Sequence, residues 1–205
     1  MASVRFEELS LRIGELRQYF LPERFEPTGS YEQCVHEHAR AFRVLAHAEF
    51  ESFIEDRVVE VIDLAVTQWQ AGSEVSSVLV AALAYRESAF SMPASLADAN
   101  AKRGKYPELA ERIEHTRTEI YRYARHQNHG IKERNLLRML LPVGVLESDL
   151  NTTWLSQTDA WATERGEAAH KAGKVQVQLD PRKEFLTVSK ILDGFREVDE
   201  MLAAK

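Results

Sequence analysis

Three arginine–histidine pairs in this sequence are separated by four to six residues, a spacing that could serve phosphate chemistry. The pairs are Arg165 with His170, Arg40 with His47, and Arg122 with His129. A histidine can accept or donate a proton near neutral pH, because its ordinary pKa is about 6.5. An arginine stays charged, and its fork binds two phosphate oxygens at once. Together these residue types suit the cleavage of RNA, which carries its own nucleophile in the 2′-hydroxyl.

The surroundings of the pairs must distinguish them, because 18 arginines and 7 histidines give such spacings by chance about as often as they are found. Arg165 and His170 follow an aromatic segment, WLSQTDAW, and Gly166 between them leaves the backbone open to close approach. Arg40 and His47 lie within a long segment with an apolar stripe, which favours a surface or an interface role. The sequence therefore favours Arg165 and His170 as the candidate site.

Motifs of other chemistries are missing or incomplete. Neither GxGxxG, GxxxxGK[ST] nor GxSxG occurs, so neither a phosphate-cradling loop nor a serine-hydrolase elbow is predicted. Cys34 is the only cysteine, which excludes a thiolate zinc site and a disulfide framework. A di-iron bundle needs two Glu-x-x-His motifs, and Glu167 with His170 is the only one. His126 and His129 could share a metal, but solvation at a helix end is the simpler interpretation. We expect neither a metal nor a cofactor.

Length and composition indicate a folded, water-soluble protein. The 205 residues fit one domain, and 44% hydrophobic residues are enough to bury a core. The longest apolar runs, Val78 to Tyr85 and Met139 to Leu146, are far shorter than the about 20 residues that a membrane-spanning helix needs. The first residues contain no apolar signal segment, so we expect a reducing, cytoplasmic compartment. The net charge of -6 argues against strong non-specific binding of nucleic acid.

The elements that must position the site are predicted to be helices, because apolar residues recur every three or four positions. The first such stripe runs from Phe6 to Phe20. A long helix follows a capping box at Ser30 and Gln33 and ends near Gly72. Further helices are predicted over 75–90, 107–125, 132–141, from Ser148 or Asp149 to about 164, and from Pro181, capped by Asp180, to about 202.

Two stretches do not follow this pattern. Residues 98–106 are typical of a loop, and Val175, Val177 and Leu179 alternate like a strand that is too short to support a sheet. We therefore predict an all-α bundle that forms a single domain over 1–205. Within it, 1–29 hold an N-terminal helix and linker, and 30–205 hold the bundle with the motif at 165–170.

Three blocks of the sequence resemble the HEPN-domain superfamily, and in particular its RiboL-PSP subgroup. TTWLSQTDAWATERGEAAHKAG is similar to the family's signature region, which carries an Arg-x(4–6)-His motif. ARAFRVLAHAEFESFIEDRVVEVID resembles the subgroup's long second helix, and NHGIKERNLLRMLLPVGV resembles the segment before the motif helix. The blocks occur in the subgroup's order and cover about residues 31–203. Gly166 stands where many members have a polar residue, and Ala172 where some have a modified tyrosine.

The resemblance implies a HEPN-type helical bundle with a long second helix and additional N- and C-terminal helices. It further implies a homodimer with a composite active site that cuts RNA without a metal, in which Arg165 and His170 are catalytic. Such a protein would be a toxin or an anti-phage defence effector with a possible antitoxin or partner protein. A dimer also suits the geometry, because positions i and i+5 of one helix point about 140° apart. Attack by the 2′-hydroxyl would leave a 2′,3′-cyclic phosphate.

Basic residues are concentrated in and before the motif. Residues 122–138 hold five basic residues against one acidic residue, and 165–183 hold five against two. Such a concentration could follow an RNA backbone, whereas a solvated helix face is the simpler interpretation. The residues that we predict to bind RNA are Lys171, Lys174, Arg122, Arg125, Lys132, Arg134 and Arg138.

Two alternatives stay open at this stage. Arg165 could be structural and pair with Asp159 or Glu164. The protein could also be a non-catalytic HEPN module that binds a partner protein or RNA.

Other residues are predicted to have structural roles. Trp154 and Trp161 are expected in the core, and so is at least one of Tyr121 and Tyr123. The acidic residues of the long helix are expected to be solvated or to pair with other helices. These are Glu49, Glu51, Glu55 and Asp56.

Overall fold

The structure is a computed structural model that describes residues 2–72, 75–85, 94–101, 108–170 and 178–205, with the backbone alone for 166–170. Among these residues every regular element is a helix, so the prediction of an all-α bundle is confirmed. The α-helices are α1 (Val4–Phe20), α2 (Gln33–Gln70), α3 (Ser77–Tyr85), α4 (Leu96–Ala101), α5 (Leu109–Arg122), α6 (Glu133–Leu140), α7 (Thr152–His170) and α8 (Pro181–Ala203). A π-helical turn (Tyr123–Gln127) and two 3-10 turns (Leu141–Val143 and Glu147–Asp149) join them.

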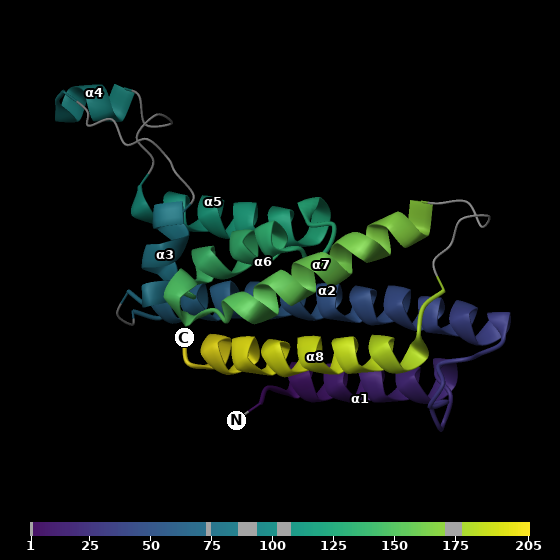
Figure 1. The fold of residues 1–205 in the computed structure, drawn as a ribbon. Coiled ribbons are helices and arrows are strands. Elements are labelled where there is room, and N and C mark those ends of the chain that lie inside the picture. The colour runs from purple at the N-terminus through teal and green to yellow at the C-terminus, as the bar shows by residue number, and fades with distance from the viewer. Residues whose placement is uncertain (1, 73–74, 86–93, 102–107, 171–177) are drawn as a thin grey trace.

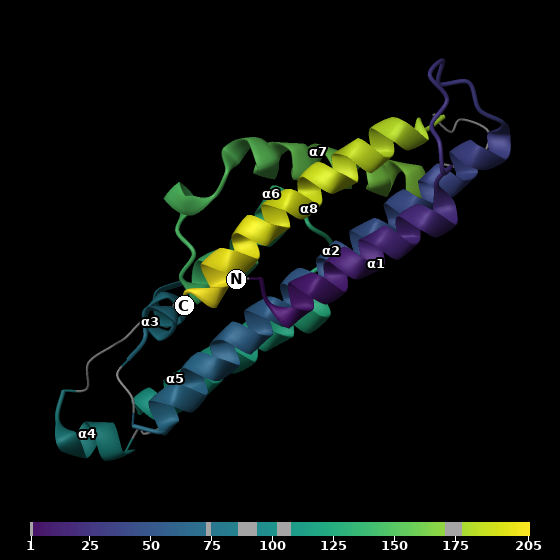
Figure 2. The ribbon, with the colours of Figure 1, turned by 90° about the horizontal axis from the view of Figure 1, so that it is seen from below.

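Helix α2 is the central element of the bundle. Its 38 residues make it about 57 Å long at 1.5 Å per residue. Helices α1 and α8 cover one side of it, and α5, α6 and α7 cover the other, whereas α4 stands apart and buries none of its residues (Figures 1 and 2). Because it is covered on two sides, α2 buries polar residues as well as its apolar stripe; these are His36, Arg43, His47 and Arg57.

A buried ion pair joins α2 to α8 beneath the motif helix. Arg43 donates from Nε and Nη2 to the two carboxylate oxygens of Glu184, at 2.9 and 2.6 Å. The Nε1 of Trp161 on α7 donates to the same carboxylate at 2.6 Å. Arg43 also reaches Glu164 on α7 at 3.1 Å. The three helices that surround the candidate site are therefore fixed by charged hydrogen bonds, which are shorter and stronger than neutral ones.

A second buried carboxylate holds the start of α1. Asp199 of α8 is fully buried and accepts hydrogen bonds from the backbone N–H and the hydroxyl of Ser3, both at 2.7 Å. Arg57 of α2 donates to it at 2.8 Å. Ser3 also caps α1 by accepting from the N–H of Phe6. The first helix is therefore joined to both α2 and α8.

The closest approach between α7 and α8 requires a glycine. An added Cβ at Gly194 would lie 2.1 Å from Cδ1 of Trp154. The indole donates from Nε1 to the carbonyl of Ile191 at 3.1 Å and meets Phe195 edge-on. Trp154 and Trp161 are 5% and 3% exposed, which confirms their predicted place in the core.

Several predicted helix boundaries are wrong, although the helices exist. The capping box at Ser30 and Gln33 does not form, because α2 begins at Gln33 with Glu32 as its N-cap. Helix α7 begins after Asn151, whose side chain accepts from the N–H of Trp154, and not after Ser148 or Asp149. Residues 98–101 of the loop predicted over 98–106 are helical and form the end of α4. The cap at Asp180 before Pro181 is confirmed by its hydrogen bonds from Arg182 and Lys183.

The end of α5 differs from its prediction in a way that matters for the site. The chain was expected to be α-helical to residue 125, but α5 ends at Arg122 and a π-helical turn follows. The N–H of Asn128 donates to the carbonyl of Tyr123, five residues back, at 2.8 Å. The side chain of Asn128 then donates to Glu55 on α2 at 2.8 Å. This contact brings residues 128–131 onto α2.

Candidate functional site

Arg165 lies on α7 one turn after Trp161, close to α2. Its Nε atom is buried and has no hydrogen-bond partner among the described residues. Its positive charge acts on two residues of α2, His47 and Glu51. The ring of His47 stacks on Trp161 with centroids 5.8 Å apart and planes at 27°.

The two carboxylates that Arg165 was considered to pair with are engaged elsewhere. Glu164 binds Arg43 at 3.1 Å. Asp159 accepts a hydrogen bond from the backbone N–H of Glu133, at 3.0 Å. The structural alternative for Arg165 is therefore wrong in this form, and the arginine faces a different set of groups.

His47 is a buried, neutral histidine and not the surface or interface residue that its place in a long apolar-striped segment suggested. It is 2% exposed, because Trp161 and the chain at Gly130 cover it. Burial, helped by the positive charge of Arg165, lowers the pKa of His47 to about 4. Its Nδ1 has no hydrogen-bond partner among the described residues and lies 3.7 Å from Oε2 of Glu51.

Glu51 and Glu55 form a half-buried pair of carboxylates beside His47. Burial raises the pKa of Glu51, and the neighbouring charge of Glu55 raises it further. Arg165, the backbone N–H of Gly130 and His129 oppose this rise. Burial also raises the pKa of Glu55, against the hydrogen bond that Asn128 donates. Both glutamates are half-buried, and Glu51 lies beside His47 and within the influence of Arg165 on α7.

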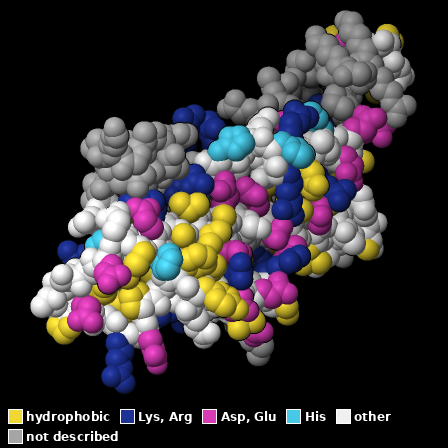
Figure 3. Space-filling view, turned by 90° about the vertical axis from the view of Figure 1, so that its right-hand side faces the viewer, with side chains coloured by type: hydrophobic (Ala, Val, Ile, Leu, Met, Phe, Trp, Pro, Cys, Tyr) yellow, Lys and Arg dark blue, Asp and Glu magenta, His cyan; other side chains and the backbone are white. Residues whose placement is uncertain are grey.

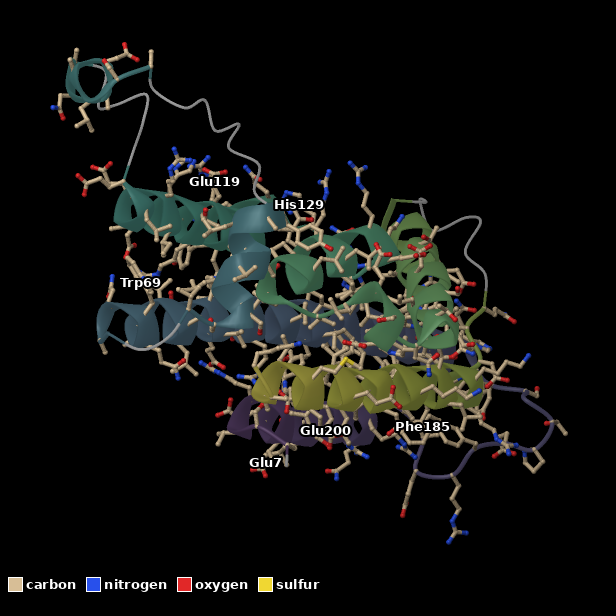
Figure 4. The ribbon with its side chains drawn as sticks, turned by 90° about the vertical axis from the view of Figure 1, so that its left-hand side faces the viewer. Glu7, Trp69, Glu119, His129, Phe185 and Glu200 are labelled. Atoms are coloured by element: carbon tan, nitrogen blue, oxygen red, sulfur yellow. The ribbon has the colours of Figure 1, made fainter. Side chains whose placement is uncertain are left out.

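His129 lies at the edge of this cluster. It is exposed beside α5 and α6, away from the layer of α1 and α8 that holds Glu7 and Glu200 (Figure 4). Its neighbour in the spacing motif, Arg122, pairs with Glu119 at 2.7 Å. His126 and His129 are both exposed, and no cluster of metal-ligating side chains occurs in the described part of the chain.

Five of the predicted RNA-binding residues are described, and they lie in three different settings. Arg122 and Arg125 are each paired with an acid, the latter with Asp56 at 2.5 Å. Arg134 and Arg138 line a groove of about 730 Å³, whose walls also include Tyr85, Tyr123, Gln127, Glu133, Leu137, Leu141, Pro142 and Asp159. Lys132 is exposed at the start of α6. Basic and acidic side chains alternate over the face shown in Figure 3, so its described part is not uniformly basic.

His170, the second predicted catalytic residue, is the last residue of α7. The backbone of His170 is helical and stands five residues beyond Arg165. The side chain of His170 lies outside the described residues, and so do Lys171 and Lys174.

Sequence reasoning missed the groups that surround Arg165. His47 occurs in the Arg40–His47 spacing, but its place in a long apolar-striped segment favoured a surface or interface role instead of a role in the site. Glu51 and Gly130 carried no signal of their own. Of the two tyrosines, Tyr123 is buried and Tyr121 is exposed, as the helical spacing predicted.

Comparison with known proteins gives one match. The family model described as RiboL-PSP-HEPN matches residues 8–204. No curated protein and no solved structure matches the chain. Within the described residues, no helix combines the length and the apolar character needed to cross a membrane.

Proposed function

Because the chain belongs to the RiboL-PSP-HEPN family, we propose that it is a metal-independent endoribonuclease with Arg165 and His170 as its catalytic residues. Homodimerisation completes the site, and the enzyme acts in the cytoplasm as a toxin or defence effector. The observation that carries the proposal is the state of Arg165. Its Nε is buried without a partner among the described residues, and Glu164 and Asp159, the two acids considered as its partners, bind other groups. An arginine donor left without a protein partner supports a role in binding a ligand such as a phosphate.

The proposed chemistry follows from the two residue types. His170 accepts the proton of the 2′-hydroxyl, and the oxygen attacks the adjacent phosphorus. Arg165 binds the non-bridging oxygens, where negative charge grows in the transition state. The bond to the 5′-oxygen breaks, and His170 returns the proton to that oxygen, while Arg165 of the second protomer holds the phosphate. The products are a 2′,3′-cyclic phosphate and a 5′-hydroxyl.

The test is RNA cleavage in EDTA by the wild type, His170→Ala and Arg165→Gln. His38→Ala is the matched control, since His38 is an exposed histidine on α2. Circular dichroism and light scattering establish that all four proteins are folded and of equal mass. We expect cleavage by the wild type and the control, with loss of about 100-fold or more in the other two. Equal cleavage by His170→Ala, or cleavage that EDTA abolishes, contradicts the proposal.

The dimer is tested separately by mixing Arg165→Gln with His170→Ala protomers. A composite site that takes its groups from both copies regains cleavage in the mixed dimer. Undiminished cleavage by a strictly monomeric variant contradicts the composite site.

The alternative is a non-catalytic module that binds a partner protein or RNA. The pairing of Arg122 and Arg125 with acids favours it, because paired cations have less charge to offer a phosphate backbone. If the folded wild type cuts no RNA, this alternative replaces the nuclease.

A further inference from the structure

The groove of about 730 Å³ beside α6 is formed by residues of several packed elements. Tyr85 ends α3, Tyr123 lies in the π-helical turn, and Asp159 belongs to α7. Helix α3 contacts α5 and the 3-10 turn at Leu141–Val143, and α6 contacts α7, so the walls belong to the folded bundle. Sites for small ligands have volumes of about 300 to 1,000 Å³. The groove therefore has the size of a site for one small ligand or for one unit of a polymer.

Two arginines of the groove are not paired with acids. Arg134 and Arg138 lie one turn apart on the same exposed face of α6, and neither forms an ion pair among the described residues. By contrast, Arg122 and Arg125 of the preceding helical segment both bind carboxylates. The guanidinium groups of the groove thus keep donors that no acid of the described chain occupies.

Aromatic side chains provide the groove with surfaces for stacking. The Cζ atom of Arg138 lies 5.8 Å from the centroid of the Tyr123 ring, within the about 6 Å of a cation–π contact. Tyr123 is 7% exposed, so a core residue holds this guanidinium in place. Tyr85, on another wall, is 53% exposed. An open aromatic ring and a guanidinium plane are the surfaces on which proteins stack unpaired bases.

Hydrogen-bond acceptors line the same groove. Glu133 and Asp159 contribute carboxylates, and Gln127 contributes an amide. The carboxylate of Asp159 accepts from the backbone N–H of Glu133 at 3.0 Å, which fixes it where α6 meets α7. Two acids balance the two arginines, so the lining is poorly suited to a bare anion. A nucleotide suits it better, because its base carries N–H donors on its edges and its phosphate suits an arginine.

We propose that this groove binds one unpaired nucleotide of a single-stranded RNA, beside the phosphate that is cut. Tyr85 and the guanidinium of Arg138 stack on the base, and Arg134 binds its phosphate. Asp159 and Arg165 are six residues apart on α7, about 9 Å along its axis, so one strand can span the groove and the candidate site. The position beside the cut rests on the proposed nuclease function, whereas the binding of a nucleotide does not.

The experiment measures binding of a short fluorescein-labelled RNA of mixed sequence by fluorescence anisotropy. The RNA is offered as a single strand and annealed to its complement, and the protein carries His170→Ala so that the probe is not consumed. Tyr85→Ala and Arg134→Gln test the groove. The matched controls are Tyr121→Ala and Arg24→Gln, since both residues are exposed and neither lines the groove. Thermal unfolding of each variant checks the fold.

We expect Tyr85→Ala to weaken binding of the single strand by about 5- to 150-fold, the range for the loss of one stacked base. Arg134→Gln is expected to weaken binding and to reduce the slope of log K against log salt by about 0.7, the value for one phosphate of a single strand. The controls are expected to bind like the parent protein. The annealed duplex is expected to bind more weakly than the single strand, because its bases stay paired and stacked.

Unchanged binding in Tyr85→Ala overturns the proposal, and so does a duplex that binds as tightly as the single strand. Binding of AMP without binding of the strand also overturns it, because the groove would then be a site for free nucleotides. If the groove variants weaken binding as expected but the wild type cuts no RNA, the nuclease is refuted and the nucleotide site stands. If the wild type cuts RNA and the groove variants bind like the controls, the nuclease stands and the nucleotide site is refuted.

Discussion

Replacing Gly194 with alanine is expected to destabilise the protein, although the same change stabilises most helices. In the interior of a helix, alanine is favoured over glycine by about 1 kcal/mol. At Gly194 the new Cβ would lie 2.1 Å from Cδ1 and 2.2 Å from Nε1 of Trp154. Atoms cannot approach so closely, so the indole or the two helices must move.

The magnitude follows from three terms. Overpacking of a core costs about 1 to 3 kcal/mol. Displacing the indole breaks the hydrogen bond from Nε1 of Trp154 to Ile191, which contributes about 1 kcal/mol. Offsetting these by the helix preference of about 1 kcal/mol leaves a net loss of about 1 to 3 kcal/mol. For a chain of this length, Tm falls by about 2 to 4 °C per kcal/mol.

The assay is urea and thermal unfolding of Gly194→Ala beside Gly14→Ala. Gly14 lies within α1, and an added Cβ there meets nothing within 4 Å. The control is therefore expected to gain about 0.5 to 1 kcal/mol. Trp154→Phe provides a second check, because the smaller ring leaves room for the methyl group. The double variant should therefore lose less stability than the two single variants lose in total. A Gly194→Ala protein as stable as Gly14→Ala would refute the close contact between α7 and α8.

Two further predictions concern buried charges. Glu184→Leu leaves Arg43 without its main partner and is expected to lower the free energy of unfolding in urea by about 3 to 5 kcal/mol. Combining it with Arg43→Met is expected to recover much of that stability. A loss below about 1 kcal/mol in Glu184→Leu alone contradicts this prediction. His47 has a folded pKa of about 4, below the ordinary 6.5, so the unfolded chain takes up the proton first as the pH falls. Relative to His47→Phe, the wild type is expected to lose about 3 kcal/mol between pH 7 and pH 4, and equal losses in both proteins would contradict the burial of a neutral imidazole.

The sequence predicted the helices better than their ends. Helix α8 was predicted closely, because Asp180 and Pro181 mark its start locally and its apolar stripe continues to Leu202. The start of α7 was missed, since Ser148, Asp149 and Asn151 are all suitable caps and only the tertiary structure selects Asn151. The π-helical turn was not predicted, because Tyr123–Gln127 continue the helical pattern of α5 and the contact of Asn128 with α2 is visible only in the tertiary structure.

Only the part of the candidate site that lies on α7 was predicted from the sequence. Arg165 was found through a local motif, whereas Glu51 and His47 lie far earlier in the chain and reach it only because α2 and α7 cross. A polar residue is expected to be exposed when nothing in the sequence indicates a partner. His47 is buried because the ring of Trp161 on α7 stacks on it. Residues of this kind become visible only when the packing of helices is known.

The π-helical turn has a consequence for insertions and deletions. It holds one residue more than an α-helical turn, and five residues of a π-helix turn the chain by about the same angle as four residues of an α-helix. Deleting one residue from 123–127 is therefore expected to restore an α-helical turn and to leave the direction of the following chain nearly unchanged. Asn128 would keep its place against Glu55, so relatives that lack one residue here would retain the same contact between the turn and α2.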